Sequence, residues 1–221
     1  MRWRERFGAL AGVAGPLAFT AAWLAAQRRQ DEYQVRHEHI SGLAARDATD
    51  PQLMTAGFLA LGGCTVVFAA ALERRLQPRP GWGPAFIGAA GLATIAAGTF
   101  RRDRRSNFPL PGMPPGQSWE NDVHDAAGVA VAAMGTAGLI ALAPRLASDP
   151  VLRPLAPEAV RAAIASLGLS AWFLRDVVRP WNGIVQRASV SVPLAFMTRL
   201  ALRLLTAPPH PRTRGLIRDQ P

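Results

Sequence analysis

Apolar residues along this chain are gathered into long uncharged blocks. Four stretches, residues 7–26, 53–72, 82–100 and 126–143, each run 18 to 20 residues without a charged side chain. A helix rises about 1.5 Å per residue, so roughly 20 apolar residues cross the hydrocarbon core of a bilayer. Four such blocks in 221 residues predict an integral membrane protein.

The blocks and their flanks predict an all-α fold, a polytopic transmembrane bundle of six helices within one domain over residues 1–206. The expected helices are residues 7–26, 53–72, 82–100, 123–143, 157–178 and 183–205. The fifth has only 13 uncharged residues and reaches bilayer width when it is extended past Arg161 and Arg175, whose side chains can snorkel to headgroups. Six crossings place both termini on the same side, and the Pro/Arg-rich residues 207–221 are expected to be a disordered tail.

The first apolar block also resembles a secretory signal peptide. It follows Met-Arg-Trp-Arg-Glu-Arg, and Thr20 and Ala22 offer a small-x-small cleavage pattern. Its apolar run is longer than the signal-peptide core of about 7–15 residues. We therefore expect a retained first helix.

The charge of the chain indicates which partners the protein binds. All 25 basic residues are arginine, and the formal net charge is +10. Such a charge suits nucleic acid as well as membranes, but the arginines flank apolar blocks and no zinc finger or other recognition module is present. We expect the lipid bilayer, including anionic headgroups, as the partner, and no nucleic acid. The mean hydropathy of only +0.10 reflects arginines and 19 prolines crowded into the connections.

The distribution of arginines predicts an orientation. With six helices, the first, third and fifth connections face one side and hold ten arginines and ten acidic residues. The opposite side, with both termini, holds fourteen arginines and five acidic residues. Cytoplasmic segments carry more basic residues, which favours cytoplasmic termini in a multi-pass protein of the plasma membrane.

Small and aromatic residues within the blocks indicate a compact bundle. Gly8, Gly12 and Gly91 place small residues on shared faces, which permits close helix approach. Cys64, the single cysteine, lies in an apolar block, which excludes an intrachain disulfide. Four tryptophans near expected helix ends indicate an aromatic belt at the membrane interfaces: Trp23, Trp82, Trp172 and Trp181.

The most unusual polar segment runs from Tyr33 through His37 and His39 to Ser41. In an extended chain, residues two apart point the same way, so the two histidines could bind zinc together. The alternative is a loop at headgroup level whose histidines hydrogen-bond locally. Two-residue spacing without an assigned third ligand favours the loop.

A second candidate lies at the start of the fourth helix. We expect Asp122 to cap this helix and Asp125 to complement its dipole. Capping does not account for His124, so the alternative is that His124 and Asp125 form a polar pair available for metal or proton chemistry.

Arginines near the membrane ends form two further candidates. Arg101, Arg102, Arg104 and Arg105 surround Asp103 after the third helix, where they suit the helix dipole and lipid phosphates. Arg187 lies inside the sixth helix, where a charge requires a partner or water. Its expected partners are carboxylates on the same side: Asp103, Asp122 and Asp125. We therefore expect the odd-numbered connections to converge on one face.

Five short motifs occur in order along residues 7–205. They are HISGL at 39–43, MTAGF at 54–58, GTFRRD at 98–103, HD at 124–125 and GIVQR at 183–187. Together they resemble bacterial membrane proteins of the domain-of-unknown-function 998 family. The resemblance implies six transmembrane helices and no settled activity. The chain departs from the pattern at Gly42, where we expect an acidic residue.

Two functional hypotheses remain open. The first is a non-enzymatic protein that binds or moves a lipid or small solute, or serves as a partner subunit, with no cofactor. The second is a membrane-embedded hydrolase in which His37, His39 and His124, with Asp103 or Asp125, hold zinc that activates water. It is similar to alkaline ceramidase-like hydrolases, which have seven helices and a fuller His/Asp/Ser set. Since no GxSxG, HExxH, P-loop or dinucleotide-binding motif occurs in a credible context, the non-enzymatic hypothesis is preferred.

Overall fold

The computed structural model of the chain describes residues 3–76, 81–104, 118–175 and 180–206. All regular secondary structure in these ranges is helical. The helices are α1 (Trp3–Arg29), η1 (Ile40–Ala44), α2 (Pro51–Arg75), α3 (Trp82–Thr99), α4 (Trp119–Ser148), η2 (Arg153–Leu155), α5 (Ala156–Arg175) and α6 (Asn182–Thr206), where η denotes a short 3-10 helix. The expected all-α fold with six long helices is confirmed. The expected tail, 207–221, lies outside the described residues.

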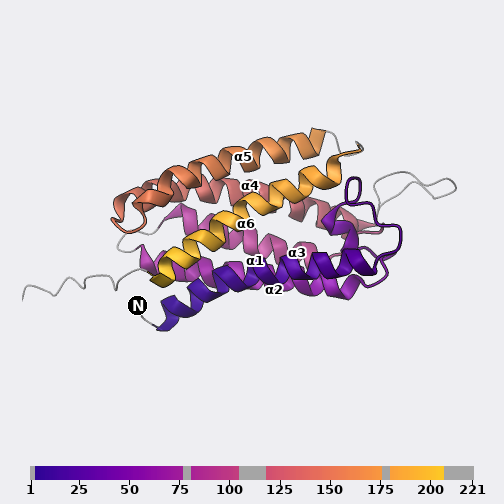
Figure 1. Ribbon diagram of the computed structural model, residues 1–221, viewed down its shortest axis with the longest axis horizontal. Coiled ribbons are helices and arrows are strands. Elements are labelled where there is room, and N and C mark those ends of the chain that lie inside the picture. Colours follow the sequence, from indigo (N-terminus) through magenta and orange to yellow (C-terminus); the bar gives the residue numbers. More distant parts are fainter. Residues whose placement is uncertain (1–2, 77–80, 105–117, 176–179, 207–221) are drawn as a thin grey trace, which may run out of the picture.

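The six α-helices form a ring, in which each packs against the next and α6 returns to α1 (Figure 1). Because successive helices alternate in direction, α1 begins and α6 ends at the same end of the bundle. We call the end with the connections after α1, α3 and α5 the polar end, and the opposite end the packed end.

Glycines bring neighbouring helices into close contact. A Cβ atom at Gly62 of α2 would lie 2.6 Å from the carbonyl oxygen of Gly91 in α3. A Cβ atom at Gly12 of α1 would lie 2.8 Å from Cβ of Ala201 in α6. The expected small-residue contacts at Gly12 and Gly91 are therefore confirmed.

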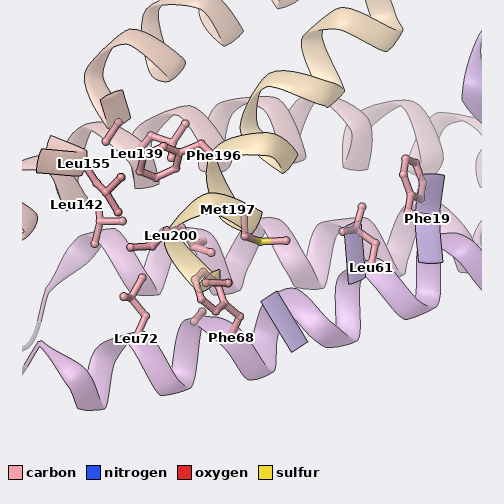
Figure 2. Packing of buried hydrophobic residues seen from close by; sticks show 14 of the residues in the cluster. Phe19, Leu61, Phe68, Leu72, Leu139, Leu142, Leu155, Phe196, Met197 and Leu200 are labelled. Carbon is pink, nitrogen blue, oxygen red and sulfur yellow. The ribbon is translucent and has the colours of Figure 1, made fainter. Parts of the chain in front are cut away.

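Large side chains fill the packed end. Leu72, Leu142 and Leu200, from α2, α4 and α6, are almost completely buried there (Figure 2). A buried ion pair lies beside them, with Nη1 of Arg75 at 2.6 Å from Oδ2 of Asp149. This end of the ring is closed by close packing.

Four helices, α1, α2, α4 and α6, are long and apolar enough to cross a membrane. α3 has 18 residues, roughly 27 Å of helix, and runs beside α2 and α4. Large apolar side chains point outward on most of the ring, and Leu17, Leu92, Ile140 and Ile164 are each more than half exposed. Such continuous apolar exposure suits a lipid environment.

The helices extend beyond the expected uncharged segments. α4 begins at Trp119 and ends at Ser148, although the sequence predicted residues 123–143. The expected cap at Asp122 is wrong, because Ser118 is the cap and its hydroxyl accepts from the backbone N–H of Asn121 at 3.3 Å. Helical hydrogen bonds continue through flanking charged residues whose side chains reach polar surroundings.

The tryptophans divide into two groups. Trp82, Trp172 and Trp181 lie at or near helix ends and are more than half exposed, as an aromatic belt requires. Trp23 is buried, and its ring meets the edge of Phe19 with centroids 5.8 Å apart. The expectation that Trp23 belongs to the belt is therefore wrong, because this residue faces the interior of the ring.

Candidate functional site

The connections at the polar end converge, as the sequence predicted. The backbone N–H of Arg46, after α1, donates to the carbonyl of Arg102, after α3, at 3.0 Å. The Arg46 guanidinium lies 3.0 Å from Oε1 of Glu120 and 3.8 Å from Oδ1 of Asp103. The α5–α6 connection contacts the connection after α1 through Trp181. The guanidinium of Arg36 lies over the Trp181 ring, 3.6 Å from its centre.

Arg187 anchors the segment between α1 and η1 to α6. Its Nη1 donates to the carbonyl oxygens of Val35 at 3.0 Å, Glu38 at 2.8 Å and Gly183 at 2.9 Å. Its Nη2 donates to the hydroxyl of Tyr33 at 2.6 Å. The hydrogen bonds of Arg187 in the described part of the chain thus go to carbonyls and a phenol, not to the carboxylates we expected as partners.

The two histidines of the 33–41 segment occupy different environments. His37 ends a turn that its backbone N–H closes on the carbonyl of Gln34 at 2.9 Å, and the chain bends at Glu38, so the extended arrangement required for joint zinc binding does not occur. His37 is half-buried, whereas His39 is buried with its ring centroid 4.8 Å from that of Phe173. Burial, with the nearby charges of Arg102 and Arg187, lowers the pKa of His39 to about 3.

A guanidinium–carboxylate pair lies next to His39. Nε of Arg102 is 3.5 Å from Oδ1 of Asp125, and Oδ2 of Asp125 accepts from Nδ2 of Asn121 at 3.0 Å. The side chain of Arg102 is only 7% exposed, while that of Asp125 is 49% exposed. Asp125 thus compensates a buried cation, as burial of a charge requires.

Asp103 has a structural role at the start of α4. Its two carboxylate oxygens accept from the backbone N–H and the hydroxyl of Ser118, at 2.6 and 2.7 Å. These two hydrogen bonds lower the pKa of Asp103, with a smaller contribution from Arg46. The carboxylate therefore fixes the cap of α4.

His124 is held in one orientation by α3. Its Nδ1 lies 2.7 Å from the carbonyl oxygen of Ala97 and 2.9 Å from that of Phe100. Both partners are acceptors, so Nδ1 carries the hydrogen, and in the neutral ring Nε2 keeps the lone pair. Carbonyls at the end of α3 thus fix the tautomer of a buried histidine.

A cavity of about 390 Å³ lies inside the ring. At the polar end its lining is hydrophilic, with contributions from the connections after α1 and α3 and from α4, α5 and α6: His39, Ser41, Arg102, His124, Asp125, Ser170, Gln186 and Ser189. Deeper in the ring, apart from the hydroxyls of Thr65, Thr94, Thr136 and Ser166, the lining is apolar: Phe19, Phe58, Leu61, Phe68, Ile87, Leu139, Phe196, Met197 and Leu200. From His124 to Leu139 along α4, the lining covers roughly 22 Å of helix.

The cavity reaches the outer surface between α4 and α5. Val129 of α4 and Leu174 of α5 both line it, and they are 49% and 52% exposed. Both lie in the half of their helix nearer the polar end. The opening is thus lateral and bordered by apolar side chains.

The structure brings together some of the candidate residues but not all. His39, Ser41, His124 and Asp125 share the cavity, while Tyr33 and Arg187 hold the segment that carries His39. His37 and Asp103 do not line it. Among the described residues, no three His, Cys, Asp or Glu side chains are grouped closely enough to hold a metal ion. The donor set that the zinc hypothesis requires is therefore not assembled.

The arginines that follow α3 lie in different environments. Arg102 is buried and lines the cavity, so it does not share the position beside lipid phosphates that the sequence predicted for all four arginines. Arg101 and Arg104 are partly exposed, and Arg105 lies outside the described residues. Contact with lipid phosphates stays a prediction for the exposed members.

Sequence reasoning missed several residues of the site. Gln186 accepts the backbone N–H of Ile40 on its Oε1 at 2.6 Å, and Ser170 and Phe173 line the cavity from α5. The GIVQR motif contains Gln186 and signalled its segment. Ser170 and Phe173 lie in an ordinary apolar helix, where no local signal distinguishes them.

These observations define a class of protein: a multi-pass helical membrane protein with a cavity inside its ring of helices. A family model described as "Protein of unknown function (DUF998)" matches residues 13–203, and the chain belongs to this family. Comparisons with the curated proteins and with the solved structures find no match.

Proposed function

We propose that this protein binds an amphiphilic lipid in the central cavity and catalyses no reaction. The observation that carries the proposal is the polarity gradient of the lining. Charged and amide side chains of the lining gather near His124 and Gln186, whereas the lining around Leu139 and Leu200 is mostly apolar and its polar groups there are the hydroxyls of Thr65 and Thr136. An amphiphile has the same gradient, with a polar head and an apolar chain.

The dimensions support a lipid chain rather than a compact solute. About 390 Å³ lies within the range of roughly 300–1,000 Å³ typical of small-molecule sites. Spread along roughly 22 Å of α4, this volume makes a narrow channel. The lateral opening at Val129 and Leu174 gives a ligand dissolved in the bilayer a route inside.

The proposal includes an orientation. All six helices cross the plasma membrane, with α3 and α5 stabilised by their neighbours in the ring. The excess of arginines on the side of the termini supports cytoplasmic termini, and the polar end then faces outward. Arg101 and Arg104 contact anionic headgroups at that surface.

Filling the cavity tests the proposal. A Cβ atom at Gly135 of α4, which lines the cavity, would meet nothing within 4 Å, so Gly135→Leu places a side chain in the space without displacing backbone. Gly168→Leu on α5 is the matched control, because Gly168 is exposed, lies outside the lining and is equally unobstructed.

The measurement is native mass spectrometry of detergent-purified protein. We expect the wild type and Gly168→Leu to retain a bound lipid mass, and Gly135→Leu to lose it while its thermal stability is unchanged. Equal lipid retention by both variants would refute the proposal.

A further inference from the structure

The charged groups around the polar end of the cavity are already matched to one another. Arg102 faces Asp125 at 3.5 Å, and the pair adds no net charge to the lining. A phosphate or carboxylate head would compete with Asp125 for Arg102. An ammonium head would compete with Arg102 for Asp125. An anionic head would place a second negative charge beside Asp125, and an ammonium head would place a second positive charge beside the buried Arg102; in either case two like charges lie close together and repel each other.

The second cation near the polar end of the cavity, Arg187, already has hydrogen-bond acceptors within the protein. Arg187 directs its guanidinium at three backbone carbonyls and at Tyr33, and these contacts hold the segment that carries His39. If the guanidinium of Arg187 turned toward a bound anion, those carbonyl oxygens would lose their hydrogen-bond donor. Arg187 also does not line the cavity.

The uncharged polar groups supply both donors and acceptors. Nε2 of neutral His124 is an acceptor, because Nδ1 donates to α3. Oε1 of Gln186 is occupied by the N–H of Ile40, which leaves the amide hydrogens of Gln186 as donors. The Ser41 hydroxyl, which also lines the cavity, serves as either. His39 is neutral at physiological pH because burial lowers its pKa to about 3.

From the compensated Arg102–Asp125 pair and the donor–acceptor set around it, we infer that the lipid bound in the cavity is a single-chain amphiphile with an uncharged, hydroxyl-bearing head. A hydroxyl donates and accepts at once, so it matches His124 and Gln186 without adding charge. The inference rests on the proposed function and specifies its ligand. Lipids with a phosphate or an amine head are disfavoured by the repulsion between their charge and the like charge of the Arg102–Asp125 pair.

Three probes with the same 18-carbon chain test the inference on the full-length protein in detergent at pH 7.5. They are 1-monooleoylglycerol, with an uncharged head, oleoyl lysophosphatidic acid, with an anionic head, and oleylamine, with a cationic head. We expect monooleoylglycerol to bind with a Kd at least about tenfold lower than either charged probe, since about 1.4 kcal/mol corresponds to a factor of ten. Gly135→Leu serves as the variant without a free cavity.

Asp125→Asn provides the specificity test. This substitution keeps the size of the side chain but removes the carboxylate that lies 3.5 Å from Arg102, so we expect the preference to move toward lysophosphatidic acid by about tenfold. Arg102→Gln should move it toward oleylamine. If a variant does not fold, its binding preference cannot be measured. The ranking of the three probes by the wild-type protein then decides the test alone.

The outcomes separate the two proposals. Tighter binding of a charged probe, lost in Gly135→Leu, overturns the inference about the head and leaves lipid binding in place. An unchanged preference in folded Asp125→Asn and Arg102→Gln also overturns it. If no probe binds in a manner sensitive to Gly135→Leu, both the head specificity and the proposed function are overturned.

Discussion

The guanidinium of Arg187 donates a 2.6 Å hydrogen bond to the hydroxyl of Tyr33, a residue 154 positions earlier in the chain. That hydroxyl in turn donates to the carbonyl oxygen of His39 at 3.0 Å. A residue of α6 thereby fixes the backbone that carries a cavity-lining histidine. The link explains how a long connection, rather than a helix, can supply part of a defined site.

Removing Arg187 should destabilise the protein. Arg187→Ala leaves three carbonyls and a phenol without their donor, so we expect a loss of about 1–3 kcal/mol in unfolding free energy. Tyr33→Phe removes the hydroxyl that links Arg187 to the carbonyl oxygens of Glu38 and His39 and should cost about 1 kcal/mol. Thermal unfolding in detergent measures both, and proteolysis within residues 30–50 should accelerate.

Arg199→Ala is the control on the same helix. Arg199 pairs with Glu158 at 2.8 Å, but its side chain is 66% exposed, and such pairs contribute about 0–1 kcal/mol. If Arg187→Ala were no more damaging than Arg199→Ala, the anchoring role would be wrong.

The buried pair at the packed end should be sensitive to removal of one partner. Arg75→Ala leaves the buried carboxylate of Asp149 unpaired, so we expect a loss of about 3–5 kcal/mol. Replacing both, with Arg75→Met and Asp149→Leu, should restore most of this stability, because no charge remains buried. Chemical denaturation of the three proteins gives the comparison, and a double variant as unstable as Arg75→Ala would contradict it.

Two adjacent glycines of α2 should respond in opposite ways. Gly62→Ala introduces a methyl group 2.6 Å from the carbonyl oxygen of Gly91, which forces α2 and α3 apart at a cost of about 1–3 kcal/mol. At Gly63 a Cβ atom would meet nothing within 4 Å, so Gly63→Ala should cause no loss. The melting temperatures of the two single variants test this prediction. Equal melting temperatures would show that the close approach of α2 and α3 at Gly62 does not limit stability.

Acidification should destabilise the protein through His39. Its pKa is about 3 in the folded protein against 6.5 for the free side chain, so below pH 6.5 the unfolded state binds more protons. The stability contributed by His39 is thus present above pH 6.5 and declines toward pH 3, by up to about 1.4 kcal/mol per pH unit.

The comparison is wild type against His39→Gln between pH 7.5 and 5. The difference in stability between the two proteins should shrink as the pH falls, because only the wild type loses this contribution. Asp103, whose pKa is lowered from 3.8, titrates below the range. A difference that stays constant with pH would show that His39 does not titrate as stated.

The helices could be predicted from the sequence because the length of each uncharged segment is enough to indicate a helix. The blocks at 7–26 and 53–72 lie within α1 and α2, and even the short apolar run at 162–174 belongs to a complete helix. The convergence of the odd connections followed from alternation of direction. These properties depend on local composition and connectivity.

The site could be predicted only in part, since its members depend on how the helices are rotated. Trp23 and Arg102 have sequence neighbourhoods typical of interfaces, yet both face the interior. Arg187 was assigned carboxylate partners because charge pairing is visible in a sequence. The backbone carbonyls that it contacts are available at every residue, so no side-chain pattern identifies them. The cavity itself arises from space between helices, which no motif encodes.

The fully buried leucines beyond Leu139 and Leu200, among them Leu72 and Leu142, give the cavity a blind bottom. Under the proposed function, a lipid that enters beside Val129 and Leu174 therefore reaches a closed end formed by these leucines. It leaves by the route through which it entered, so the proposed function in this conformation is retention of a lipid and not its passage from one face of the membrane to the other.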